Sequence, residues 1–369
     1  MKHSTRIRSS ILLVAAVAAL IPATILAQSD PTVVASGLNG PMGVLVTDSG
    51  VWVVDSGFGG EERIEMTDPH TGAPGTVTFG ETARILRVET DGTVTEVGTL
   101  PSMTIPTGEA MGGGRIAAVG DAVYATSGAW MEVPGTEPGA RMSSIVRIGA
   151  EGIEEIVNAY AFEKANNPDG NLIESNPFGL IAGPDGNLWM TDAAANALLK
   201  LDPATGEMEV AAVFGPVPSP IPNPNHHGKL ETDAVPTGLA FGSDGSLYVA
   251  VLPGFPLMPG HSKIVRIDPD GSMTDHATTL TTIVDLRVGP DGEMYAVSFG
   301  RFTDQGPEPM SGSVVRVREG EVSEVVLSNL SFPTSIDFNE NGDAYLTTNG
   351  VGAPGSGELL VYRGLAAAQ

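Results

Sequence analysis

A β-rich unit recurs six times along this 369-residue chain, and no other feature constrains the fold as strongly. Each unit opens with a Pro-x-small-apolar run, turns at an Asp-Gly-like pair and enters a strand with an aromatic residue. Residues 176–189 and 235–248 are two examples. The aromatic position reads Trp52, Tyr124, Trp189, Tyr248, Tyr295 and Tyr345. Asp-Gly between short β-rich runs predicts hairpins, so each unit is expected to be antiparallel β-structure.

Each complete unit goes on to a third and a fourth β-rich run, as in residues 84–88 and 95–100. Four short strands recurring every several tens of residues predict a propeller blade. The sixth unit stops after its third run, whereas residues 32–38 resemble a fourth run with no unit before them. We therefore predict an all-β, six-bladed β-propeller whose last blade is closed by the N-terminal strand. Such closure removes an exposed sheet edge.

The N-terminal segment has the order of a secretory signal. Lys2, Arg6 and Arg8 precede an apolar run over residues 11–26, and polar residues follow Ala27. This order predicts a signal peptide over residues 1–27 and a single propeller domain over residues 28–369. The expected location is secreted or periplasmic. A retained membrane anchor is the alternative, and no other apolar run approaches the roughly 20 residues that span a bilayer.

The charge and the cysteine count exclude several classes of function. The chain carries 19 Lys and Arg against 44 Asp and Glu, and three of the basic residues fall in the predicted signal peptide. So acidic a surface repels nucleic acid. There is no cysteine, which excludes thiol catalysis, cysteine-ligated zinc and iron–sulfur clusters. The expected partner is a small molecule or an extracellular protein, and the expected state is a monomer without a membrane span.

Loop lengths predict which end of the ring carries the function. Long connections follow the second strand of several units, at residues 56–83, 128–143, 253–263 and 300–312. Two connections between units, residues 162–176 and 215–234, are also long. Both classes emerge at the same end of a propeller, and long loops on a rigid scaffold commonly carry binding and catalysis.

Acidic residues at that end are candidate ligands for a cation or a polar molecule. Asp55 and Asp192 end second strands, and Asn196 follows Asp192 in a short loop. Asp285 occupies a position in the first strand that is otherwise small. The small residues assigned to it are Gly43, Gly108, Gly179, Gly238 and Ser335. The alternative is that the two strand-end aspartates only cap turns, and that Asp285 is a solvated channel residue.

The interblade loop of residues 163–171 concentrates oxygen ligands. Glu163, Asn167 and Asp169 lie in it, and hard cations such as calcium need several oxygens. No EF-hand spacing occurs. His226 and His227 are expected in an exposed loop, and no metalloprotease or serine-hydrolase motif is present. No other cofactor is expected. The recurring basic position is interpreted as scaffold paired with acidic neighbours. It reads Arg87, Arg147, Lys200, Arg266 and Arg316.

A stretch within residues 160–295 resembles the ScyD/ScyE family. The likeness rests on residues 161–170, Asn176-Pro177-Phe178-Gly179, Thr191-Asp192 with Asn196, and residues 234–238 and 252–256. It extends more weakly over the rest of the chain. The resemblance implies an exported NHL/TolB-type six-bladed propeller, and the family offers no established catalytic residues. Mild departures occur at residues 192–196 and 253–256.

Three functions fit these observations. The favoured prediction is a non-catalytic exported propeller that binds a ligand or partner on its loop-rich face. The alternative is a metal-dependent hydrolase or lactonase with an acidic site at the channel mouth. The third is an extracellular scaffold for protein interactions. The fold does not choose among them.

Overall fold

The computed structural model describes residues 30–67, 72–133, 135–303, 305–320 and 323–367. The predicted signal peptide, residues 1–27, lies outside these ranges. Within them β-strands are the dominant regular structure, with 58% strand against 3% helix, which confirms the all-β prediction. The same ranges hold no helix long and apolar enough to cross a membrane.

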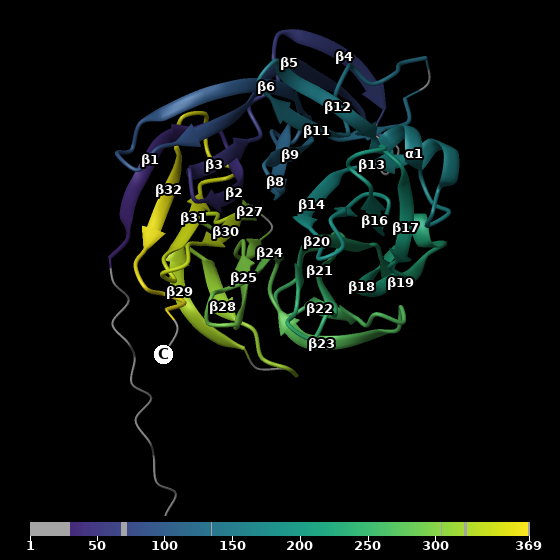
Figure 1. Ribbon diagram of the computed structural model, residues 1–369. Helices are drawn as coiled ribbons and strands as arrows, with labels where there is room; N and C mark the ends of the chain where they lie inside the picture. Colours follow the sequence, from purple (N-terminus) through teal and green to yellow (C-terminus); the bar gives the residue numbers. More distant parts are fainter. Residues whose placement is uncertain (1–29, 68–71, 134, 304, 321–322, 368–369) are drawn as a thin grey trace, which may run out of the picture.

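Most of the described strands belong to six sheets arranged around a common centre (Figure 1). The first sheet contains β2 (Pro41–Thr47), β3 (Gly50–Asp55), β4 (Glu62–Thr67), β5 (Pro74–Val88), β6 (Val94–Thr104) and β7 (Ala110–Met111). The second contains β8 (Gly113–Val119), β9 (Ala122–Ser127), β11 (Ser144–Gly149) and β12 (Gly152–Asn158). The third contains β14 (Pro177–Ala182), β15 (Leu188–Asp192), β16 (Ala197–Leu201) and β17 (Met208–Val213).

The remaining three large sheets follow the same order of strands. The fourth contains β20 (Ala234–Phe241), β21 (Leu247–Pro253), β22 (Ser262–Ile267) and β23 (Met273–Leu280). The fifth contains β24 (Ile283–Val288), β25 (Met294–Ser298), β28 (Gly312–Arg316) and β29 (Glu324–Leu330). The sixth contains β30 (Ser335–Phe338), β31 (Ala344–Thr348), β32 (Gly357–Tyr362) and β1 (Thr32–Leu38).

Strand β1 lies in the same sheet as the last strand of the chain. It pairs antiparallel with β32, and Thr32 lies opposite Val361. At the centre, β2 contacts β8 on one side and β30 on the other, and β8, β14, β20, β24 and β30 contact one another in turn. Apolar side chains fill the space between neighbouring sheets. Tyr124 and Ile145 of the second sheet, for example, pack with Leu180 and Leu199 of the third.

The recurring aromatic and basic residues face each other across neighbouring strands. Trp189 of β15 lies opposite Lys200 of β16, whose Nζ is 5.4 Å from the indole centroid. The same Nζ lies 2.9 Å from a carboxylate oxygen of Asp185. Equivalent register pairs join Trp52 with Arg87, Tyr124 with Arg147, Tyr248 with Arg266 and Tyr295 with Arg316. Acidic partners also lie beside Arg147, Arg266 and Arg316, so the predicted pairing of these basic residues with acidic neighbours is confirmed.

Short elements occupy the long connections. These are β10 (Trp130–Met131), β13 (Glu174–Ser175), β18 (Val217–Asn223), the 3-10 helix η1 (Pro224–His226), β19 (Lys229–Thr232), β26 (Phe302–Thr303), β27 (Gly306–Pro307) and the helix α1 (Ala159–Asn166). Helix α1 corrects the prediction that residues 163–171 are all loop. Asn158 caps the helix by accepting from the N–H of Ala161 at 2.8 Å, and the segment that follows is rich in helix-forming residues.

Candidate functional site

Arg115 fills the centre of the channel. It occupies the first-strand position of the second unit that the repeat pattern predicts to be Gly108. In the structure, Gly113 of β8 lies opposite Ser127, just as Pro41 of β2 lies opposite Asp55. This register makes Arg115, two residues further on, the counterpart of Gly43. The repeat pattern did not indicate Arg115, because glycine replaces proline at the start of this unit. Gly108 instead lies in the turn before β7.

The Arg115 guanidinium connects four sheets. It donates to the carbonyl oxygens of Val284 at 2.7 Å and Thr334 at 2.9 Å, and also to that of Met42. Its Cζ lies 4.6 Å from the ring centroid of Phe178. The residue is only 1 % exposed, and burial lowers its pKa. An arginine stays charged under such conditions, so the channel has a fixed positive charge at its centre.

Asp285 supplies the counter-charge, which differs from the predicted role of a ligand at the channel mouth. Its Oδ1 lies 3.6 Å from Arg115 Nε, and its Oδ2 accepts from the Ser335 hydroxyl at 2.7 Å and from the N–H of Ile336. The carboxylate is buried and its oxygens are occupied by these partners. Asp285 therefore belongs to the closed channel centre.

A cavity of about 550 Å³ lies at the channel mouth. Several wall residues come from equivalent places in different units, one residue before the first-strand position occupied by Gly43 in the first unit. They include Met42, Phe178, Val284 and Thr334. Three of these supply backbone carbonyls to Arg115, so the guanidinium lies directly behind this wall. The volume falls in the range of pockets that bind small molecules.

Glu109 is the carboxylate among the described residues that line this cavity. It lies in the turn between β6 and β7, where its carbonyl accepts from the N–H of Ile105 at 3.0 Å. Glu109 is exposed to solvent, and the protein packed around its carboxyl raises the pKa of that group. No sequence pattern indicated Glu109, because the turn lies outside the repeated motif.

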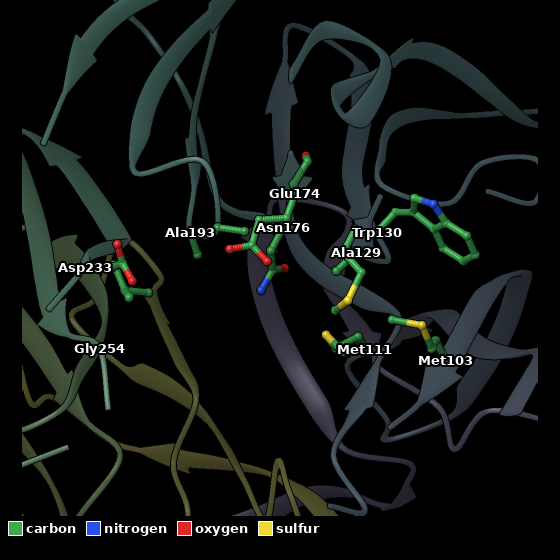
Figure 2. Close-up of a pocket in the computed structure, with 13 residues that line it drawn as sticks. Met103, Met111, Ala129, Trp130, Glu174, Asn176, Ala193, Asp233 and Gly254 are labelled. Atoms are coloured by element: carbon green, nitrogen blue, oxygen red, sulfur yellow. The ribbon is translucent and has the colours of Figure 1, made fainter. Parts of the chain in front are cut away.

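A second cavity of about 260 Å³ adjoins the first and shares Asn176, Ala193 and Val235 with it. Figure 2 shows Glu174 and Asn176 between Asp233 on one side and Trp130 on the other. Asp233 Oδ1 lies 3.0 Å from His226 Nε2. His226 was predicted to lie in a plain exposed loop, but this contact and its half-buried position place it behind the cavity wall.

Asp55 and Asp192 are fully buried and stabilise strand ends. Asp55 Oδ1 accepts from the N–H of Arg84 at 2.8 Å, and its Oδ2 accepts from the Arg84 guanidinium. Asp192 Oδ1 accepts from the N–H groups of Asn176 and Ala195. Burial raises the pKa of both carboxyls. The alternative in which they cap turns therefore describes both residues better than a shared ligand site.

The predicted residues Asn196, Asp169 and Glu163 lie near the third sheet. Asn196 Nδ2 donates to Asp169 Oδ2 at 2.7 Å. Glu163 of α1 is 1 % exposed, and both of its carboxylate oxygens lack a hydrogen-bond partner. Burial, together with the charges of Asp192, Asp169 and Glu174, raises the pKa of Glu163 to about 8.

The ring of sheets and the cavity at its centre define the chain as a β-propeller-like protein with a small-molecule pocket. Residues 177–353 match the SMP-30/Gluconolactonase/LRE-like region. A gluconolactonase of Zymomonas mobilis is 23 % identical over 200 residues. That match covers 50 % of this chain, and the chain spans about half the length of this curated relative, 52 %.

Two solved structures share the fold over nearly the whole chain. One was provisionally described as a gluconolactonase; it has a TM-score of 0.52 at 14 % identity and covers 92 % of this chain and 94 % of its own. The other, from Thermus thermophilus, was provisionally described as a glucose dehydrogenase. It has a TM-score of 0.52 at 17 % identity and covers 90 % of this chain and 99 % of its own. At such identities the likeness shows the fold alone.

These comparisons correct the favoured functional prediction. The non-catalytic binding propeller is wrong, because the match over residues 177–353 and the similarity to a gluconolactonase favour an enzyme. They agree better with the alternative, a lactonase. The comparisons support the broader likeness to the gluconolactonase group and do not reach the ScyD/ScyE family specifically.

A divalent metal, which gluconolactonase-like proteins often use, does not fit the channel centre of this chain. The wall residues that contact the Arg115 guanidinium are apolar or carry a hydroxyl, namely Met42, Phe178, Val284 and Thr334. A fixed cation repels a second cation in a site of low dielectric constant. The described residues also contain no cluster of three or more His, Asp or Glu side chains suited to a metal.

Proposed function

We propose that this chain is a lactone hydrolase that opens a cyclic ester, of the sugar-lactone class, in the channel-mouth cavity. The observation that carries the proposal is Glu109, a solvent-accessible carboxylate with a raised pKa on the wall of a cavity of about 550 Å³. The match of residues 177–353 to the gluconolactonase group supports the reaction type. The wall also carries threonine hydroxyls and aromatic rings, which suit a small ring compound.

In this mechanism Glu109 acts as the general base. Its carboxylate takes a proton from water as the water oxygen attacks the lactone carbonyl carbon. The ring C–O bond then breaks, and the proton passes from Glu109 to the departing ring oxygen. The products balance as one hydroxy acid from one lactone and one water. A base with a raised pKa is better matched to this transfer than an ordinary glutamate.

The Asn176 side chain is the proposed donor to the lactone carbonyl. It lines both cavities, and its backbone is fixed because its N–H donates to buried Asp192 at 2.7 Å. A positioned amide donor stabilises the negative charge that develops on the carbonyl oxygen. Asn176 therefore orients the lactone carbonyl, while Glu109 supplies the base.

The experiment follows acid release from a six-membered sugar lactone at constant pH, with spontaneous ring opening subtracted. The purified protein is expected to accelerate the reaction, and Asn176→Ala is expected to lower kcat. A rate equal to the background across five- and six-membered lactones contradicts the proposal.

The finer assignments of fold and location are part of the same proposal. The six sheets, the contacts among their central strands and the pairing of β1 with β32 support a six-bladed propeller closed by its N-terminal strand. The ScyD/ScyE resemblance supports membership in that family, and the basic-then-apolar N-terminal order supports export.

A further inference from the structure

We infer that the junction of helix α1 with the loop after β15 is a calcium site, formed by Glu163, Asn167 and Asn196. This inference concerns a place outside the channel-mouth cavity and does not depend on the proposed lactonase activity. It assigns a ligand role to residues that the hydrolytic mechanism leaves unused.

The first observation is a set of buried oxygens without partners. Both carboxylate oxygens of Glu163 and the side-chain oxygens of Asn167 and Asn196 have no hydrogen-bond partner. Among the described residues, these are all the buried carboxylate and amide oxygens in that condition. Buried polar atoms are nearly always satisfied, so four unpaired oxygens in one neighbourhood require an explanation.

The orientation of the two amides is fixed by their nitrogen atoms. Asn196 Nδ2 donates to Asp169 at 2.7 Å, and Asn167 Nδ2 donates to the carbonyl of Asn171 at 3.0 Å. Turning either amide over would place an oxygen against another oxygen. The Oδ1 atoms must therefore point away from these partners and remain without a donor.

The charges around Glu163 favour a cation. Asp192, Asp169 and Glu174 are the charged groups that act on it most strongly, and all three are negative. The next residue, Lys164, is directed elsewhere: its Nζ lies 3.2 Å from a carboxylate oxygen of exposed Glu137. A buried carboxylate among like charges is costly unless a cation compensates it.

The donor types fit calcium better than other metals. Calcium binds six to eight oxygens in a flexible geometry and accepts bidentate carboxylates and amide oxygens. Glu163, Asn167 and Asn196 supply four such oxygens, and water or backbone carbonyls complete the shell. The three proposed ligand residues include no histidine or cysteine, the side chains that zinc sites commonly use.

The site connects the wall of the cavities to the scaffold. Helix α1 contacts β13, which continues into the wall residues Glu174 and Asn176 (Figure 1). Asn196 belongs to the turn between β15 and β16 in the third sheet. Calcium bound by both segments would hold the cavity wall against that sheet.

The test compares calcium with EDTA in the full mature chain, by thermal unfolding and by calorimetric titration with calcium chloride. For the wild type, calcium at about 100 times its Kd is expected to raise Tm by roughly 5 °C. Glu163→Gln is expected to lose this gain. Glu137→Gln, a matched change at the nearby exposed carboxylate, is expected to retain it.

The ranking of the variants reverses with calcium if the inference is correct. In EDTA, Glu163→Gln is expected to be at least as stable as the wild type, because glutamine keeps the shape of the side chain and cannot ionise among the neighbouring carboxylates. In calcium, the wild type becomes the more stable protein. A glutamate that is merely structural would leave the order the same in both conditions, and that result overturns the inference.

A second variant covers the case in which Glu163→Gln does not fold. Asn167 has a φ of 39°, a left-handed conformation that glycine also adopts, so Asn167→Gly removes the ligand oxygen without backbone strain. Its calcium affinity is expected to fall at least about tenfold. A wild-type protein that takes up no calcium in the titration, or an Asn167→Gly variant with unchanged affinity, contradicts the site.

Discussion

Arg115 Nε lies 3.6 Å from Asp285 Oδ1, and the two side chains are 1 % and 3 % exposed. They occupy equivalent positions on the first strands of the second and fifth sheets, where the other units have glycine or serine. The small residues leave the room that one guanidinium and one carboxylate fill. The pair therefore connects the second and fifth sheets behind the wall of the cavity.

Replacing Arg115 with methionine is expected to destabilise the protein strongly. Removing one partner of a buried ion pair leaves the other charge uncompensated, which costs about 3–5 kcal/mol. The carbonyls of Met42, Val284 and Thr334 also lose their donor. Denaturant unfolding of Arg115→Met measures the loss.

Arg147→Met provides the matched control. Arg147 lies in the same sheet, but its ion pair with Glu154 is exposed, and such pairs contribute about 0–1 kcal/mol. The double variant Arg115→Met with Asp285→Leu is expected to lose less than the sum of the single changes. Equal losses for Arg115→Met and Arg147→Met would show that the central pair has no special role.

Leu38→Ala tests whether β1 contributes to the stability of the whole ring. Leu38 is 1 % exposed and packs in the apolar cluster between the sixth and first sheets, so its truncation should cost about 2–5 kcal/mol. Val33→Ala, on the same strand but 53 % exposed, should change the free energy of unfolding by less than about 0.5 kcal/mol. Similar small losses for both variants would indicate that β1 is only loosely attached.

The pH dependence of hydrolysis is expected to follow Glu109. The general base must be ionised, and desolvation raises its pKa above the usual glutamate value of 4.5. Activity should therefore rise with pH through a midpoint above 4.5, measured in kcat/KM so that the free enzyme is reported. In Glu109→Gln this limb should disappear; a limb that remains in place would assign the base to another group.

Asp343 is expected to make the free energy of unfolding depend on pH in the acidic range. It accepts from Arg363 Nη1 at 2.6 Å and from the N–H of Gly364 at 2.8 Å, and its pKa is lowered below 3.8. Its contribution is therefore present above the unfolded pKa and disappears as pH falls through the folded value. Asp343→Asn should cost about 1–3 kcal/mol at pH 7, with a smaller difference at pH 3. A difference that is constant with pH argues against an ionised Asp343.

The repeated part of the fold could be predicted from the sequence because each unit carries the same local signals. The six aromatic residues from Trp52 to Tyr345 all lie on second strands, and a basic residue on the third strand lies opposite each of the first five. These positions recur because the second and third strands pair in the same register in each of these sheets. Helix α1 was missed because it occurs once, and its last residues fall in the connection of residues 162–176 that was expected to be a loop.

The sites were harder to predict because they arise where the repeat is broken. The position of Arg115 could not be predicted because its unit begins with glycine where most of the others have proline. Glu109 lies in a turn that belongs to no motif. Asp55 and Asp192 end equivalent strands, but each is satisfied within its own sheet, so shared position did not mean a shared ligand. Glu163 was found as an oxygen donor, while its burial without a partner is visible only in three dimensions.

The central claim is tested most directly by kcat/KM for sugar-lactone hydrolysis in two glutamine variants. Glu109→Gln removes the proposed base, whereas Glu340→Gln changes an exposed carboxylate in the short turn between β30 and β31. The account predicts a loss of about 10²–10⁴-fold for Glu109→Gln and an unchanged value for Glu340→Gln. Retention of the wild-type rate in Glu109→Gln would contradict it.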